Sequence, residues 1–182
     1  MRRRQVLEAA IRLGAEGGYD AVQMRAVADR SGVALGTIYR YFSSKDDLLI
    51  AGLAGWLRLT RKRLEDEEVR CDTPHERLTR LLSGVARSVE ASPMLMQALV
   101  RAQGSTSPAS GPHKLDVEDE QRALIVTALG ETYPNASEIA RVIGHVWSSA
   151  STRWVTGLAP NGSLGAEFCN AIDLLVPSTP EG

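Results

Sequence analysis

The stretch from Met24 to Lys45 concentrates side chains that suit contact with a nucleic acid. Arg40 can neutralise a phosphate or pair with guanine, and Thr37 can donate to a phosphate or set its methyl group against thymine. Tyr39 and Tyr41 carry hydroxyl groups that reach phosphate oxygens. These residue types are typical of a surface that binds double-stranded DNA.

Three further positions in or beside this stretch fit the same chemistry. Gly36 lets the backbone approach a phosphate, because glycine has no side chain in the way. Lys45 starts the next expected helix, where its charge adds to backbone N–H groups that face an anion. Arg25, near the start of the preceding helix, is placed to reach a base or a phosphate. The candidate DNA-binding residues are Arg25, Leu35, Gly36, Thr37, Tyr39, Arg40, Tyr41 and Lys45.

A helix-turn-helix would hold these side chains in place. The apolar spacing predicts a helix over residues 23–30, a tight turn at 31–33 and a second short helix over 35–41. In this motif the second helix enters the major groove and the first braces it. One face of the pair must therefore be buried, and the residues predicted for that face are Val33, Ile38 and Phe42.

Helical periodicity continues through the rest of the chain. An amphipathic helix over 3–17 should end at Gly17-Gly18, and Ser44 and Thr73 are typical N-cap residues for later helices. The composition of residues 104–112 predicts a flexible loop. Together the patterns predict an all-α protein of about nine helices with no strand, whose later helices include 115–131, 136–157 and 163–176.

Charge is distributed unevenly although the formal net charge is only −1. Residues 1–45 hold eight basic and four acidic residues, so the remainder of the chain carries a balance of −5. A basic N-terminal segment on a mildly acidic body is expected when one end meets a polyanion.

Signatures of catalysis and metal binding are absent from the sequence. It contains no GxSxG, GxxxxGK[ST], HExxH or GxGxxG motif, and its three histidines are isolated from one another and from Cys71 and Cys169. We therefore expect no catalytic residues, no metal and no cofactor, and we expect that the protein is not an enzyme.

The sequence also predicts a cytoplasmic protein with reduced thiols. No apolar stretch approaches the ~20 residues that a membrane span requires. The N-terminus begins like a signal peptide, but Glu8, Arg12 and Glu16 interrupt the region that would have to be apolar.

Residues 3–55 resemble the DNA-binding domain of TetR-family regulators. The family typically shows G-V-x-x-G-T-[LIV]-Y-x-[HY]-F-x-[SN]-K, and residues 32–45 read GVALGTIYRYFSSK, a full match at the same spacing. The sequence departs from the family at Gln23-Met24, where many relatives have a threonine that caps the second helix and touches phosphate. Gln23 could substitute for this threonine, but the resemblance does not carry the threonine's phosphate contact over to it.

Segments further along the chain are similar to the KstR-type repressors, which control steroid catabolism in actinobacteria. The similar segments are residues 19–25, 93–95 and 139–147. This resemblance implies a bulky, steroid-derived acyl-CoA as a candidate effector, with other acyl-CoAs as alternatives.

The TetR resemblance also implies an organisation and partners. We expect a DNA-binding domain over 1–47, a ligand-binding and dimerisation domain over 48–176, and a disordered tail over 177–182. Such a protein would be a homodimeric repressor that binds a palindromic operator and is released by a small apolar effector. Dimer contacts would involve 136–157 and 163–176, while Trp147, Trp154 and Phe168 suit either a core or an interface.

The expected effector cavity would lie among apolar residues, each of which also fits an ordinary core. The candidate lining residues are Leu81, Val85, Met94, Leu95, Leu99 and Trp147. A helical interaction module without DNA binding is the alternative function. An acidic substitution at Arg40 or Lys45 would separate the two, because only a DNA-binding regulator should lose its activity.

Overall fold

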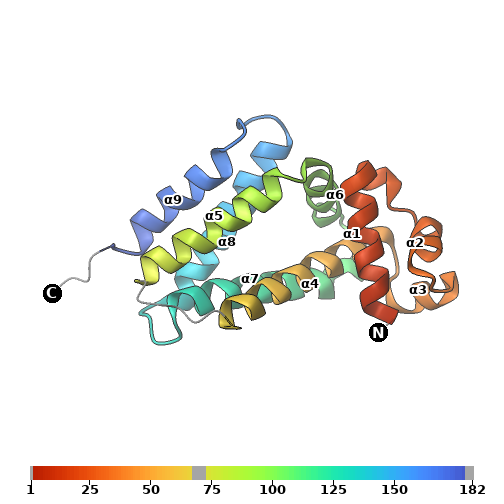
Figure 1. Ribbon diagram of the computed structural model, residues 1–182, viewed down its shortest axis with the longest axis horizontal. Helices are drawn as coiled ribbons and strands as arrows, with labels where there is room; N and C mark the ends of the chain where they lie inside the picture. The colour runs from red at the N-terminus through yellow and green to blue at the C-terminus, as the bar shows by residue number, and fades with distance from the viewer. Residues whose placement is uncertain (1, 67–72, 179–182) are drawn as a thin grey trace. The chain divides into compact units, whose positions relative to one another are not determined.

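A computed structural model describes residues 2–66 and 73–178 of the chain (Figure 1). The described residues form nine α-helices, one short 3₁₀ helix and no β-strand. The prediction of an all-α protein is therefore confirmed. The chain divides into two compact units, one made of residues 1–56 and 92–117 and the other of residues 57–91 and 118–182.

The first unit contains the N-terminal helices and a later segment that packs on them. Its helices are α1 (Arg2–Ala21), α2 (Met24–Ser31), α3 (Leu35–Tyr41), the first half of α4 (Lys45–Asp66), α6 (Pro93–Gln103), the 3₁₀ helix η1 (Pro108–Ser110) and the start of α7 (Gly111–Leu129). α1 packs against α6 and α2. The fully buried side chains of this unit include Val6, Val22, Val27, Ile38, Leu48, Leu49 and Ile50.

Glycines allow the close approach of α1 to its neighbours. A Cβ atom added to Gly14 of α1 would lie only 3.0 Å from Cδ1 of Leu95 on α6. A Cβ atom added to Gly52 of α4 would lie 2.9 Å from Cδ1 of Ile11 on α1. The expected end of the first helix at Gly17-Gly18 is partly correct: Gly18 breaks the helical geometry with φ 68°, but helical hydrogen bonding resumes as far as Ala21.

The second unit is a bundle formed by the end of α4, α5 (Pro74–Glu90), the rest of α7, α8 (Ala136–Val155) and α9 (Ser163–Leu175). α9 packs on both α5 and α8. Buried Trp147 and Phe168 meet with ring centroids 5.5 Å apart, and Trp154 is also buried. The large aromatic residues of α8 and α9 thus belong to the core of the single chain.

Local capping sets several helix boundaries as predicted. Thr73 and Glu76 form a reciprocal capping box, in which Glu76 N–H donates to Thr73 Oγ1 at 3.2 Å and Thr73 N–H donates to Glu76 Oε2 at 2.8 Å. This arrangement holds the pKa of Glu76 below its usual value, chiefly through the hydrogen bond from the Thr73 backbone. Ser44 Oγ accepts from Asp47 N–H at 3.1 Å, which confirms the predicted N-cap.

The prediction of a loop over 104–112 was wrong at its C-terminal end. Residues Pro108–Ser110 form the 3₁₀ helix η1 and α7 begins at Gly111. Pro112 does not prevent this, because a proline in the first helical turn replaces an N–H that has no helical partner. The expected disordered tail falls largely on residues 179–182, outside the described part of the chain, as does Cys71.

Candidate nucleic-acid interface

The turn between α2 and α3 depends on Gly32. Its backbone is left-handed, with φ 67° and ψ 18°, and its N–H donates to Ala28 O at 3.0 Å to close the end of α2. Ser31 Oγ accepts from Val33 N–H at 3.3 Å on the other side of the turn. A side chain at position 32 would be strained in this conformation, so the glycine fixes the angle at which α3 leaves α2.

The short helix α3 has one buried and one exposed face, as the motif requires. Val33, Ile38 and Phe42 are 6%, 0% and 1% exposed, which confirms the predicted inner face. The exposed side is centred on Arg40 and has Tyr39 and Tyr41 on its two flanks, 53% and 41% exposed. An exposed tyrosine offers a partner both an apolar ring and a hydroxyl group, so this face is a candidate contact surface.

The remaining candidate residues of α3 lie on or beside this exposed face. Gly36 and Arg40 are exposed, whereas Leu35 and Thr37 are half-buried. The Arg40 guanidinium carbon lies 5.5 Å from the centroid of the Tyr41 ring, a cation–π distance that orients the arginine. The structure therefore brings six of the eight candidate residues together on one short helix.

Gly36 has no structural reason within the chain to be a glycine. A Cβ at this position would meet nothing within 4 Å, and its backbone is not left-handed. Glycine inside a helix costs about 1 kcal/mol relative to alanine. Glycine at position 36 therefore lowers the stability of α3 but lets another molecule approach the backbone closely.

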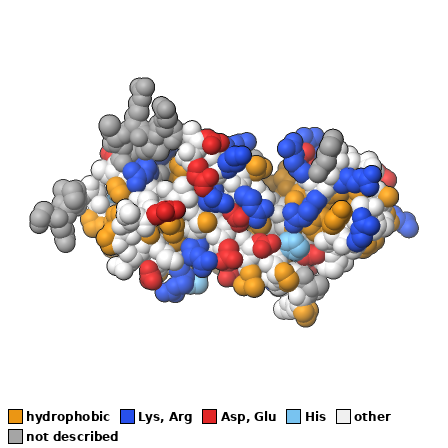
Figure 2. All heavy atoms as spheres, turned by 90° about the horizontal axis from the view of Figure 1, so that it is seen from below, with side chains coloured by type: hydrophobic (Ala, Val, Ile, Leu, Met, Phe, Trp, Pro, Cys, Tyr) orange, Lys and Arg blue, Asp and Glu red, His pale blue; other side chains and the backbone are white. Residues whose placement is uncertain are grey.

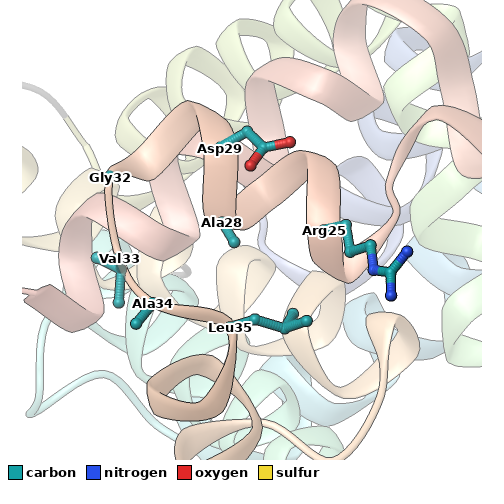
Figure 3. A pocket seen from close by; sticks show the side chains of 7 residues that line it. All are labelled: Arg25, Ala28, Asp29, Gly32, Val33, Ala34 and Leu35. Atoms are coloured by element: carbon teal, nitrogen blue, oxygen red, sulfur yellow. The ribbon is translucent and has the colours of Figure 1, made fainter.

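An open groove of about 590 Å³ lies where α2 meets the start of α3. Figure 3 shows Ala28 of α2 and Leu35 of α3 facing the space between the two helices, with the Arg25 side chain extending beside them and Asp29 pointing away. Two candidate residues, Arg25 and Leu35, thus meet at one groove. Its full lining is Arg25, Ala28, Asp29, Gly32, Val33, Ala34 and Leu35.

Lys45 at the start of α4 is held by α1 rather than projecting freely. Its Nζ donates to Tyr19 O at 3.2 Å and lies 3.8 Å from the centroid of the Tyr19 ring. The Arg101 guanidinium of α6 approaches the same ring at 4.0 Å, and Asp20 lies near both cations. Lys45 keeps 29% of its side chain exposed, and an ammonium has three donors, so donors remain for an anion.

Tyr19 is anchored at its other end by a hydrogen bond from its hydroxyl to Asp46. Burial of the phenol and this bond raise the pKa of Tyr19 to about 12. The hydroxyl therefore stays protonated, and stays a donor, at any pH near neutrality.

Asp47 is a buried carboxylate beneath the junction of α3 and α4. It is 4% exposed, and its Oδ2 accepts from Ser43 N–H at 2.8 Å and from Ser43 Oγ at 3.2 Å. Its Oδ1 lies 2.7 Å from Nδ1 of His113 on α7. No sequence pattern pointed to His113, because it is 66 positions from Asp47 along the chain.

Gln23 does not replace the capping threonine found in many relatives. It occupies the N-cap of α2 with extended backbone, but its side chain makes no capping hydrogen bond. Its Nε2 instead donates to Asp20 O at 3.4 Å. The start of α2 is thus left without a side-chain cap.

Comparison with known proteins identifies the family. Residues 6–51 match the model described as "Bacterial regulatory proteins, tetR family", and residues 71–175 match "Tetracyclin repressor-like, C-terminal domain". The chain belongs to the TetR family. It is therefore a DNA-binding transcriptional regulator, as the helix-turn-helix predicted.

The similarity to named TetR-family members extends over nearly the whole chain. The repressor KstR of Mycobacterium tuberculosis is 34% identical over 177 residues, which cover 96% of this chain and 80% of that protein. A crystal structure of a TetR regulator from Rhodococcus sp. RHA1 matches with a TM-score of 0.84 at 27% identity, over 98% of this chain and 97% of that one. The likeness to KstR-type repressors is thus confirmed. Relatives named as transcriptional repressors indicate a regulator rather than an enzyme.

Fold similarity also reaches a family member with a bound ligand. FadR of Bacillus subtilis, crystallised with stearoyl-CoA, matches with a TM-score of 0.65 at 21% identity, over 97% of this chain and 98% of that one. At this identity the match establishes the shared TetR fold.

The six residues predicted to line an effector cavity fall in both compact units of this TetR-family chain. Leu81, Val85 and Trp147 belong to the second unit, where Val85 and Trp147 are buried. In the first unit Leu99 is buried and Leu95 packs against Gly14. Met94 is 43% exposed, and its Cε lies 3.7 Å from the position that a Cβ atom on Gly18 would take. Met94 and Leu95 therefore contact α1 directly.

Basic side chains predominate over the part of the molecule that carries the TetR-type helix-turn-helix. On the face drawn in Figure 2, Lys and Arg side chains cover much of the surface around the N-terminal helices with a few Asp and Glu among them, whereas both signs are mixed elsewhere. Within the described residues, no helix combines the length and apolar character that crossing a membrane demands.

Proposed function

We propose that this protein is a homodimeric repressor whose operator affinity is lowered by an apolar acyl-CoA effector. The observation that carries the DNA-binding part is the outer face of α3, where Gly36, Tyr39 and Arg40 are all exposed to solvent. We assign this role to residues 1–47 and effector binding and dimerisation to residues 48–176.

The DNA contacts divide by residue type. Arg40 and Thr37 suit base edges in the major groove, while Tyr39 and Tyr41 suit phosphates on either side. The groove between Arg25 and Leu35 is concave enough to receive part of the DNA backbone or a thymine methyl group. Lys45 adds a positively charged phosphate contact at the N-terminus of α4.

Dimerisation through α8 and α9 would supply the two-fold symmetry of a palindromic operator. Both helices leave apolar side chains in solvent, since Val142 is 37% and Leu174 85% exposed. Ser148 and Ser149 are also exposed on α8, and small residues permit close packing of helices. In such a dimer the two recognition helices would be about 34–36 Å apart, one turn of DNA.

Acyl-CoA is the effector class best supported by similarity. FadR of Bacillus subtilis has been crystallised with stearoyl-CoA and FadR of Thermus thermophilus with lauroyl-CoA, and both share this fold. The likeness to KstR favours a steroid-derived acyl chain over a linear one. The residues that we propose for contact with an apolar acyl chain are Leu81, Val85 and Trp147 of the second unit and, separately, Met94, Leu95 and Leu99 of the first.

Release follows if the effector binds better to the form with low DNA affinity. Only this difference in affinity can shift the equilibrium between the two forms. Met94 and Leu95 contact α1, so an effector that displaced them would disturb the helix on which α2 and α3 pack.

The first experiment is selection of genomic fragments by the purified protein, followed by affinity measurement on the best fragment across a salt series. A regulator should enrich a palindrome and bind it more weakly as salt rises. The selected fragment then reports release by stearoyl-CoA and by steroid-derived acyl-CoAs. If none of these ligands lowers the affinity, the effector assignment is wrong while the DNA-binding function stands.

A helical interaction module is tested with the same fragment. Arg40→Glu should abolish binding because it sets a negative charge against the DNA, while leaving the fold intact at this exposed position. Arg12→Glu, an equally exposed substitution on α1, serves as the matched control. Equal affinity of both variants would contradict the role of Arg40.

A further inference from the structure

His113 is the side chain through which α7 reaches the α3–α4 junction. It is 18% exposed, and three neighbours surround its ring: Asp47 of α4, Phe42 at the end of α3, and Arg3 of α1. Its ring centroid is 6.0 Å from that of Phe42, and its Nε2 is 3.5 Å from the Arg3 guanidinium. All four residues belong to the first compact unit.

The contact with Asp47 defines the role of one ring nitrogen of His113. A carboxylate only accepts, so Nδ1, 2.7 Å from Asp47 Oδ1, must carry a hydrogen. Nε2 lies 3.5 Å from the Arg3 guanidinium, at the outer limit of a hydrogen bond. The geometry therefore makes Nδ1 the nitrogen that donates to Asp47.

Asp47 carries this contact to the end of the recognition helix. The buried carboxylate has three donors, two from Ser43 and one from His113. Ser43 directly follows Phe42, the C-cap of α3, so the carboxylate holds the chain where α3 ends and α4 begins. Removing a donor leaves a buried charge under-satisfied, and the junction must shift to recover solvent or another partner.

The same two helices are also joined in the second unit. Glu120 of α7 accepts from Arg58 Nε at 2.6 Å and from Arg61 Nη2 at 3.3 Å, and both arginines lie on α4. α4 and α7 each run through residues of both units. A polar contact thus ties α7 to α4 in each unit.

We propose that His113 is a positioning residue for DNA binding, which orients the recognition helix α3 through Asp47 and Ser43. It makes no DNA contact itself. Because α7 continues into the second unit, a change there can alter DNA affinity by loosening the hydrogen bond from His113 to Asp47. This last step rests on the proposed release by an effector.

Two substitutions at position 113 test the role of Nδ1. His113→Leu keeps much of the volume but removes the donor, and should weaken binding of the selected operator fragment about tenfold, as expected for one charge-assisted hydrogen bond. His113→Asn places an amide N–H near the position of Nδ1 and should restore most of the affinity. The salt dependence should be unchanged in both, since no phosphate contact is lost.

His75 offers a matched control. It is 17% exposed and pairs with Asp173 at 2.9 Å, but it lies in the second unit. Because Asp173 is next to Leu174 of the proposed dimer contact, the control is His75→Leu shown by sedimentation to be dimeric. That dimer should keep operator affinity within about twofold of the wild type. Equal losses in His75→Leu and His113→Leu would overturn the proposal, as would wild-type affinity in His113→Leu.

A double-mutant cycle with Asp47→Asn tests whether His113 acts on α3 through Asp47. The variant carrying both His113→Leu and Asp47→Asn should bind no more weakly than Asp47→Asn alone, whereas additive losses would overturn it. Nitrogen chemical shifts of the His113 imidazole in the wild type test the hydrogen bond from Nδ1 to Asp47 without any substitution. A hydrogen on Nε2 and none on Nδ1 would contradict this hydrogen bond.

Stearoyl-CoA is the probe for the effector step. The ratio of operator affinities without and with stearoyl-CoA should be smaller in His113→Leu than in the wild type; an unchanged ratio would overturn this step. If the wild type itself does not respond, the proposed effector class fails, and the affinity measurements above still decide the role of His113.

Discussion

The ammonium group of Lys45 lies against the ring of Tyr19, 3.8 Å from its centroid, and donates to the Tyr19 carbonyl oxygen at 3.2 Å. This contact joins the start of α4 to the end of α1. The two contacts restrict the long side chain of Lys45 to a defined orientation. Lys45 is the residue that the sequence predicts to bind a phosphate.

Substitutions at these two positions should differ in their salt dependence. Lys45→Met removes one phosphate contact from each subunit of the proposed dimer, so it should weaken operator binding and reduce the slope of log affinity against log salt by about 1.8. Tyr19→Leu removes the ring that helps to orient Lys45, together with the hydrogen bond to Asp46 and the ring contact of Arg101, but no group proposed to contact phosphate. It should therefore weaken binding with the slope unchanged. An unchanged slope in Lys45→Met would show that this lysine makes no phosphate contact.

Ionisation of the Tyr19 hydroxyl should lower the free energy of unfolding at high pH. Its pKa is raised to about 12, chiefly by burial and then by the hydrogen bond to Asp46, from a usual value near 10. A raised pKa means that this contribution is complete below about pH 10 and is lost as pH rises through about 12. Urea unfolding across this range should show the loss, and Tyr19→Phe should show a smaller one.

Gly36→Ala should separate stability from DNA binding. Nothing lies within 4 Å of the added methyl group, so the substitution should stabilise the protein by up to about 1 kcal/mol in thermal unfolding. Operator affinity should fall, because the methyl group occupies space that DNA approaches. Gly84→Ala in α5, where only the end of Arg87 is near, should stabilise without changing affinity. Undiminished binding by Gly36→Ala would exclude close approach of DNA at this position.

Gly32→Ala should act in the opposite direction on stability. The left-handed backbone at φ 67° costs an alanine about 1–2 kcal/mol, so the unfolding temperature should fall. Operator binding should weaken as well, since the angle between α2 and α3 depends on this turn. An alanine variant as stable as the wild type would mean that the turn relaxes to another conformation.

Leu174→Asp tests the proposed dimer. Leu174 is 85% exposed on α9, so a charge there should not disturb the core but should break an apolar contact between two chains. Sedimentation should show a monomer, and operator affinity should fall because a single recognition helix remains per molecule. Leu59→Asp, at an exposed position on α4, is the control and should leave the dimer intact. A dimer that persists in Leu174→Asp would place the interface elsewhere.

Local patterns along the sequence determined much of this protein. The bounds of α3 and the N-caps at Ser44 and Thr73 follow from residues close together in the sequence, and the structure confirms them. The buried face of Val33, Ile38 and Phe42 followed from the same helical spacing. Such features are encoded by near neighbours, so a single sequence is enough to find them.

Tertiary structure alone decided which distant residues meet. The contacts of His113 with Asp47, of Arg101 with Tyr19, and of Arg77 with the carbonyl groups at the end of α7 join residues 51 to 82 positions apart, and no local pattern marks them. The physical reason is that such pairs form only after helices pack, when the burial of apolar faces brings polar groups together and each must find a partner. The sequence thus specified the helix that we propose to read DNA, while packing specified which distant side chains contact the segment where it ends.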